Sequence, residues 1–191
     1  MDMTTHRRKT PGRPPGFDRD AALEVALDAL WAGGYEATPI GDLIARMGLS
    51  RSSFYAAFGS KRGAMLSAIR YYSAGALDEL RALAARGAPP RDRLRAMAEI
   101  IASIDDDRGC FIVNCITELA RRDEDVRAIA GDHNAALERL LGETLGELDV
   151  RNASTSARTV LAASYGVTVL KTAGTEPDSL RRTLSDLIDA I

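Results

Sequence analysis

The spacing of apolar residues constrains this chain more than any other feature. Ile40, Leu43, Ile44 and Met47 stand at i, i+3, i+4 and i+7, which puts them on one face of a helix. The same period returns in most segments, and no stretch alternates apolar and polar residues for long enough to indicate a strand. We therefore expect an all-α fold.

Length and composition limit the class of protein. The 191 residues give room for two modules but not for several. Apolar residues make up 46% of the chain and charged residues 27%, the balance of an ordinary globular protein. The basic amino terminus has no apolar run behind it, and about 18 consecutive apolar residues occur nowhere, so we expect a cytoplasmic protein without a membrane partner.

Only two cysteines occur, Cys110 and Cys115. Five residues apart on one helix, their side chains would point in directions about 140° apart. We therefore expect neither a disulfide nor a zinc site from them, and no motif indicates a cofactor or another metal.

Capping residues, glycines and prolines divide the helical pattern into elements. Asp18 can cap a first helix that ends at Gly33. Thr38 can cap a second helix that has Pro39 as its first residue. The other expected helices cover 50–58, 60 to about 86, 91–104, 108–122, 124–148, 152–173 and 177–191.

Two helical patterns of about two turns each flank the turn Gly48-Leu49-Ser50. Two short helices joined by such a turn form a helix-turn-helix, which presents its second helix to the major groove of DNA. In that second helix Phe54 and Phe58 are available for packing. The side chains left to face outward, with groups suited to base edges and phosphates, are Arg51, Ser52, Ser53 and Tyr55.

The alternative for the same pattern is a hairpin of two helices in a bundle that binds no DNA. Three features favour DNA binding. Residues 43–77 contain five basic residues and no acidic one, a basic arm precedes the first helix, and polar side chains crowd a short helix. Residues 1–77 carry ten Lys and Arg against seven Asp and Glu, a net charge of +3, whereas residues 78–191 carry fifteen against twenty, a net charge of −5.

Four short motifs lie between residues 12 and 66. They are Gly34-Tyr35-Glu36-Ala37-Thr38, Met47-Gly48-Leu49-Ser50, Ser53-Phe54-Tyr55 and Phe58-Gly59-Ser60-Lys61. Together with the residues around them, they resemble the amino-terminal domain of TetR/AcrR-type transcriptional regulators. The resemblance implies that residues 51–55 enter the groove and that Thr38, Tyr55 and Lys61 contact phosphates. Pro39 stands where the family often has Ser or Thr, and Ala57 stands where it often has His. One phosphate contact is therefore expected to be absent.

The resemblance also implies how the chain is organised. We expect a flexible basic arm over residues 1–16, a helix-turn-helix domain over 17–64, and a helical regulatory and dimerisation domain over 65–191. The resemblance further implies a homodimer on a palindromic site in double-stranded DNA, and a repressor that a small-molecule or electrophile inducer releases. The arm residues that can add phosphate or minor-groove contacts are Arg7, Arg8, Lys9 and Arg13.

Cys110 is the candidate for a reactive thiol. Three aspartates at residues 105–107 predict a helix start that places Cys110 in or near the first turn, where the helix terminus and Arg108 favour the thiolate while the aspartates oppose it. The Gly-Cys and Asn pattern around Cys110, Phe111 and Asn114 resembles one branch of TetR-like regulators, some of which respond through a cysteine. The alternative is a small, buried, apolar cysteine, which is also the expected state of Cys115.

A cysteine-dependent enzyme is the alternative from another class, with Cys110 as nucleophile and His133 as base. No third orienting residue or oxyanion loop is recognisable, and we expect His133 to be a solvent-exposed or capping histidine. The chain is therefore not expected to be an enzyme.

The last two expected helices have features of an interface as well as of a core. Small residues that permit close helix approach are Ala162, Ala163, Gly166 and Ala173. Leucines and isoleucines recur at helical spacing between residues 180 and 191. The family resemblance favours a dimer made by these helices, and we expect Leu184 and Leu187 to lie in its interface.

Overall fold

The computed structural model describes residues 17–191, and this part of the chain folds into α-helices joined by turns, without a strand. The helices are α1 (Arg19–Gly33), α2 (Ile40–Arg46), α3 (Arg51–Phe58), α4 (Lys61–Ala84), α5 (Pro90–Ile101), α6 (Phe111–Leu119), α7 (Glu124–Gly146), α8 (Ala153–Thr172) and α9 (Pro177–Ala190). The all-α fold expected from the spacing of apolar residues is confirmed.

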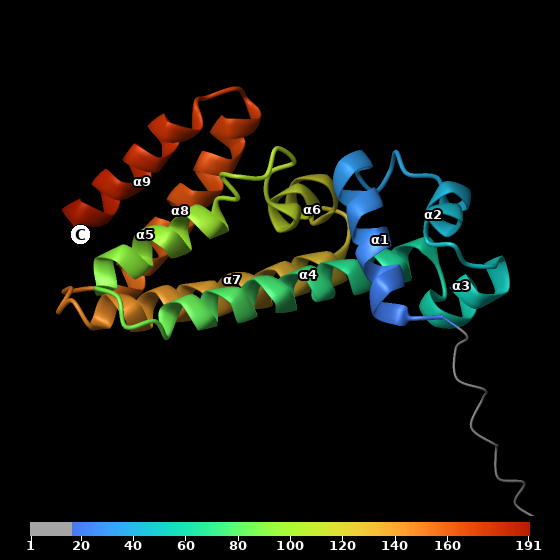
Figure 1. The fold of residues 1–191 in the computed structure, drawn as a ribbon, viewed down its shortest axis with the longest axis horizontal. Coiled ribbons are helices and arrows are strands. Elements are labelled where there is room, and N and C mark those ends of the chain that lie inside the picture. The colour runs from blue at the N-terminus through green and yellow to red at the C-terminus, as the bar shows by residue number, and fades with distance from the viewer. Residues whose placement is uncertain (1–16) are drawn as a thin grey trace, which may run out of the picture.

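The helices form a small head and a larger body. Helices α1, α2 and α3 make the head at one end of the molecule, and the long helix α4 leads from it into the body beside α7 (Figure 1). Helices α5, α8 and α9 lie at the other end, where the chain terminates (Figure 1). Helix α1 packs against α4, and both α4 and α8 pack against α7. Throughout, "head" means α1–α3 and "body" means α4–α9.

Capping residues fix the ends of the helices in the head. The Asp18 carboxylate accepts hydrogen bonds from the N–H groups of Asp20 and Ala21 and so caps α1. Gly48 has a φ of +64°, a left-handed conformation that lets the chain turn sharply between α2 and α3. The expected helix-turn-helix is therefore present, with Ser50 as the cap of α3.

The expectation that Thr38 caps α2 is wrong. Pro39 occupies the capping position, and no side chain caps this helix. Thr38 is buried, and its hydroxyl donates to the backbone oxygen of Gly34, 2.7 Å away. The hydroxyl thus satisfies a carbonyl at the end of α1 instead of an N–H at the start of α2.

The expectation that the aspartates at residues 105–107 start a helix is also wrong. Helix α6 begins at Phe111, and Cys110 stands at its capping position. Asp106 instead closes a local turn, in which its carboxylate accepts from the N–H of Arg108 at 2.9 Å. The thiol of Cys110 is therefore at the helix start, as expected, but the acidic groups lie in the preceding turn.

Two apolar cores hold the molecule together. The first joins the head to α6, to the first half of α4 and to the start of α7, and Phe54, Ile69 and Ile112 are buried in it. The second joins the rest of α4 to α5, α7, α8 and α9, and Leu80 and Leu141 are buried in it. Helix α4 therefore belongs to both cores, and the head shares its core with part of the body.

No helix within residues 17–191 is long and apolar enough to cross a lipid bilayer.

Candidate DNA-binding surface and ligand cavity

Helix α3 divides its residues between the first core and solvent. Phe54 and Phe58 are buried, with ring centroids 5.5 Å apart. Arg51, Ser52 and Tyr55 are exposed, and Tyr55 remains 45% exposed although its side chain is large and apolar. The sequence predicted this division, except that Ser53, expected to face outward, is half-buried. The division leaves a polar face on a short helix at the tip of the head.

Hydrogen bonds fix the first turn of α3. The Ser50 Oγ accepts the N–H of Ser53 at 3.1 Å and donates to the Ser53 hydroxyl at 2.9 Å. The Ser52 hydroxyl lies 2.9 Å from the same oxygen. These bonds orient the hydroxyls of both serines, which lowers the conformational entropy that they lose on binding a partner.

Lys61 and Thr38 differ in whether they have a hydrogen-bond donor left for a phosphate. The Lys61 ammonium lies 4.3 Å from the centre of the Tyr35 ring, an attractive contact that orients the side chain. The ammonium forms no ion pair within residues 17–191, so it has N–H donors left for an anion. The Thr38 hydroxyl has only one hydrogen, which already goes to the Gly34 oxygen.

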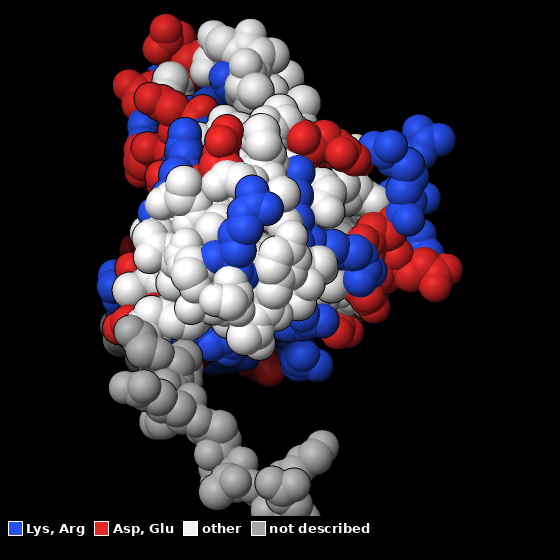
Figure 2. Space-filling view, turned by 90° about the vertical axis from the view of Figure 1, so that its right-hand side faces the viewer, with Lys and Arg blue, Asp and Glu red and all other residues white. Residues whose placement is uncertain are grey.

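The outer face of the head is neutral and basic. Figure 2 looks onto this end of the molecule and shows Lys and Arg side chains across a largely uncharged surface, with acidic side chains nearer its margins. Exposed arginines from the acid-free segment are Arg46, Arg51 and Arg70. Arg62 from the same segment is engaged elsewhere, because it binds Asp123 and Asp125 at 2.7 Å each. Its guanidinium holds the pKa of Asp123 below the usual value.

The arm residues Arg7, Arg8, Lys9 and Arg13 lie outside the described residues.

Polar contacts tie the head to the body. The Glu118 carboxylate at the end of α6 accepts the N–H groups of Tyr35 and Glu36 in the head, at 3.0 and 2.8 Å. The Arg108 guanidinium lies 4.0 Å from the centre of the Trp31 ring and forms an ion pair with Asp28 at 2.8 Å. These contacts of Glu118 and Arg108 are called the head clamp.

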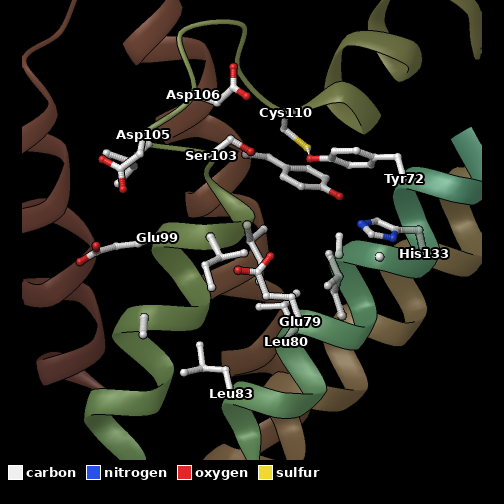
Figure 3. A pocket seen from close by; sticks show the side chains of 18 of the residues that line it. Tyr72, Glu79, Leu80, Leu83, Glu99, Ser103, Asp105, Asp106, Cys110 and His133 are labelled. Atoms are coloured by element: carbon white, nitrogen blue, oxygen red, sulfur yellow. Dashed lines mark hydrogen bonds between the residues drawn. The ribbon is translucent and has the colours of Figure 1, made fainter. Parts of the chain in front are cut away.

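A cavity of about 790 Å³ opens between α1 and the body, next to the clamp. Its walls come from α1, α4, α5, α7 and α8 and from the segment before α6. Trp31, Tyr72 and Tyr165 supply aromatic surface, and Cys110 and His133 line the cavity between them. Figure 3 shows the side chains converging on this space from separate helices.

The structure separates the three candidate sensing residues. Cys110 is buried at the cavity wall, and its sulfur lies 3.7 Å from the Tyr72 hydroxyl oxygen. Phe111 is buried beside the Trp31 and Tyr72 rings and does not line the cavity. Asn114 donates to the backbone oxygen of Arg108 at 3.0 Å, which stabilises the turn before α6. Of the three, only Cys110 can meet a molecule in the cavity.

Cys115 is buried away from the cavity, as expected for a core residue. Burial raises the pKa of its thiol, so the reactive thiolate is scarce.

The expectation for His133 is wrong, because this side chain is only 4% exposed. It lies within α7 and lines the cavity, and its Nδ1 is 2.8 Å from the Ser73 hydroxyl. Burial lowers the pKa of His133 to about 4, so the ring is neutral at pH 7. The polar partner of Cys110 is Tyr72 and that of His133 is Ser73, so these side chains do not form a nucleophile and base pair.

Sequence reasoning missed most of the cavity and the whole head clamp. Trp31 and Tyr72 have the spacing of ordinary core residues, and Glu79 has that of a solvated helix face. Glu118 and Tyr35 are 83 residues apart, so no local pattern connects them. Within residues 17–191 no three His, Cys, Asp or Glu side chains gather so that they could hold a metal ion.

Helix α8 exposes an apolar face. Val169 is 56% exposed and Leu170 50%, and small residues of the same helix, Ala162 and Gly166, are exposed as well. Leu184 on α9 is instead buried in the second core, so its expected place in an interface is wrong. Its position on α9 faces the neighbouring helices of the body and not solvent.

Comparisons with known proteins agree with this geometry. The family model described as "Bacterial regulatory proteins, tetR family" matches residues 22–68. The HTH-type transcriptional repressor ComR of Escherichia coli (strain K12) is 32% identical over 158 residues, which cover 78% of this chain and 74% of that protein.

Solved structures extend the likeness over nearly the whole chain. A cysteine-substituted form of the TetR family transcriptional regulator CifR, complexed with 26-base-pair double-strand operator DNA, is 26% identical with a TM-score of 0.75 and covers 93% of this chain and 99% of its own. The reduced form of Escherichia coli NemR shares the fold, with 19% identity, a TM-score of 0.79 and coverage of 88% and 94% of the two chains.

Proposed function

This chain belongs to the TetR family of bacterial regulatory proteins, and from that premise we propose that the exposed face of α3 reads its operator and that a ligand in the cavity releases it. The protein is a sequence-specific, DNA-binding transcriptional regulator and not an enzyme, and it acts as a homodimer on double-stranded DNA. The family model, the ComR likeness and the CifR–operator complex together support repression as the mode of action.

The observation that carries the DNA-binding proposal is the division of α3. Its aromatic residues Phe54 and Phe58 anchor the helix in the core, so Arg51, Ser52 and Tyr55 stand on a rigid element at the tip of the head. A dimer carries two such helices, so the operator is partly palindromic, with half-site centres about 34–36 Å apart or a multiple of that distance.

Each candidate residue receives a role from its chemistry. Arg51 can grip a guanine with two hydrogen bonds, and the oriented hydroxyls of Ser52 and Ser53 can meet base edges or phosphates. Tyr55 and Lys61 contact phosphates. The Thr38 hydroxyl is occupied at Gly34, so its contribution to DNA binding is to hold the turn before α2.

The arm completes the proposed interface. Its basic residues, which add phosphate or minor-groove contacts, are Arg7, Arg8, Lys9 and Arg13.

A binding titration with site-directed variants tests these roles. We expect Arg51→Ala to weaken binding to a site selected from random DNA by about 1–3 kcal/mol and to relax specificity at one base of each half-site. Lys61→Ala should weaken binding to all sequences alike and lower the salt slope by about one unit for each phosphate that the variant no longer binds.

Arg139→Ala is the matched control, since it removes an exposed arginine from α7, far along the body. The proposal is wrong if the intact dimer does not distinguish the selected site from a scrambled one. It is equally wrong if Arg51→Ala and Tyr55→Ala both behave like the Arg139 variant.

The remaining assignments concern the body. We propose that residues 17–64 act as the DNA-binding domain and residues 65–191 as the regulatory and dimerisation domain, and that the dimer forms through the exposed face of α8 together with α9. The inducer is a small molecule or an electrophile that enters the cavity, and Cys110 is the group that an electrophile would meet there. The protein works in the cytoplasm, where operator DNA is accessible.

A further inference from the structure

One polar atom at the inner end of the cavity lacks a protein partner. His133 is almost fully buried and uses Nδ1 to bond Ser73, while its Nε2 has no hydrogen-bond partner within residues 17–191. Figure 3 shows the His133 ring directed into the cavity. His133 Nε2 is not sealed from solvent, since within residues 17–191 the fully buried side-chain polar atom without a partner is Arg93 Nε. A ligand in the cavity can therefore take the place of solvent as the hydrogen-bond partner of Nε2.

The aromatic walls offer ring surface and not hydroxyl groups. The Tyr165 hydroxyl already donates to Asn134 Oδ1 at 2.6 Å, and the Tyr72 hydroxyl is paired with Cys110. The Trp31 and Tyr72 rings meet edge to face, with centroids 5.1 Å apart. Such surfaces suit an apolar or flat body, and π faces attract cations, although the Trp31 ring already holds the Arg108 guanidinium.

Carboxylates outnumber basic side chains in the lining of the cavity. Its lining includes four carboxylates and one basic side chain, namely Glu79, Glu99, Asp105, Asp106 and Arg86. Arginines outside the lining already pair with three of the carboxylates, since Arg181 binds Glu99 and Asp105 and Arg108 binds Asp106. Glu79 and Arg86 are exposed and have no ion pair within residues 17–191. The Glu79 carboxylate projects into the space between α4 and α5 (Figure 3).

We propose that the cavity binds an organic cation, with its ammonium group at Glu79, its apolar or aromatic body against Trp31, Tyr72 and Tyr165, and a polar group at His133. A volume of about 790 Å³ accommodates a molecule of this kind. The Glu79 carboxylate would repel an anionic ligand, and the one basic side chain of the lining, Arg86, stands seven residues further along the chain. This assignment rests on the proposed function, in which a ligand in the cavity releases DNA.

Three probes with one aromatic body and different charges test the proposal. They are a naphthylmethyl trimethylammonium cation, the neutral naphthylethanol and the anion naphthylacetate. We expect calorimetry on the full-length dimer to give a Kd about tenfold lower for the cation than for the alcohol, and no measurable binding of the anion. Glu79→Gln should remove the preference for the cation while the affinity for the alcohol stays the same.

Asp78→Asn is the control, because it makes the same charge change at the preceding residue of α4, which pairs with Arg81 and does not line the cavity. Equal affinities of the wild-type protein for the cation and the alcohol would overturn the proposal, as would an unchanged cation preference in Glu79→Gln. Operator binding measured without a probe on the same preparations tests the proposed function by itself. A dimer that does not bind the operator would contradict the proposed function. The Kd values of the three probes would still show whether the cavity prefers the cation.

Discussion

Phe54 and Tyr55 are neighbours in the chain with opposite surroundings, and the sequence predicts both. The helical period places Phe54 inward, and the position of Tyr55 on the polar face follows from the same period. The helical period does not predict hydrogen-bond partners. The predictions for Thr38 and His133 were wrong for this reason. Both side chains are buried and hydrogen-bonded. The partner of Thr38 is Gly34 across a turn, and the partner of His133 is Ser73 on another helix.

The two cysteines should react at different rates. Cys110 lines the cavity, whereas Cys115 is buried elsewhere and its thiol pKa is raised by burial. We expect a small maleimide to label Cys110 first, because a thiolate must form and be reached before it attacks. Mass spectrometry of the partly labelled protein ranks the two sites. Faster labelling of Cys115, or an unaltered inducer response in Cys110→Ser, would contradict a sensing role.

The buried ring of His133 should make stability depend on pH. Its pKa is about 4 in the folded protein against 6.5 for the free side chain, so between these values the unfolded chain binds a proton that the folded protein does not. The free energy of unfolding should therefore fall as pH drops from about 6.5 to about 4, by at most roughly 3 kcal/mol. Urea titrations at several pH values measure this slope. The slope should become shallower in His133→Asn, and a slope identical in the two proteins would contradict this account.

At the scale of elements, glycines and caps determined how much could be predicted. The start of α1, the end of α2 and the start of α3 were predicted from Asp18, Gly48 and Ser50, respectively, because these residues act on their own neighbours. Helix α6 was predicted to start too early, since Asp106 can cap a helix or close a turn with equal ease and the sequence does not distinguish the two. The basic charge that residues 43–77 offer to DNA was overestimated by one residue, because Arg62 pairs with acids near the start of α7.

Glu118 should hold the turn between α1 and α2. Removal of its carboxylate in Glu118→Ala leaves the N–H groups of Tyr35 and Glu36 without their acceptor, so we expect faster amide exchange at these two residues. The free energy of unfolding should also fall, by about 1–2 kcal/mol. Hydrogen exchange read by mass spectrometry and urea unfolding measure the two effects. Glu124→Ala, which removes a well exposed carboxylate, is the control, and equal exchange in both variants would show that the clamp does not hold this turn.

For the whole molecule, the sequence indicated that the last two helices are amphipathic but not which side faces solvent. Leu184 and Val169 both fit an apolar stripe, yet Leu184 is buried within the body and Val169 is exposed. The difference depends on how α8 and α9 pack against α5 and α7, which no local pattern contains.

The exposed face of α8 should hold the dimer together. We expect the double change Val169→Glu and Leu170→Glu to give a monomer at micromolar concentration, because two charges on each chain would have to be buried in the interface. Its affinity for the palindromic operator should fall, since one head reads only one half-site. Sedimentation velocity measures the assembly. Val25→Glu changes an exposed apolar residue of α1 and should leave the dimer intact, whereas a dimeric double variant would place the interface elsewhere.

The shared first core has a consequence for building chimeric regulators. Joining this head to a foreign body at residue 64 would cut through a core in which side chains of the head pack against α6 and the start of α7. A graft that carries the head alone would expose apolar surface on both parts and would remove the partners of Trp31 and Tyr35. The segments that must be transferred together are therefore discontinuous in sequence. A functional hybrid needs the residues of α4 and α6 that pack against the head as well as the head itself.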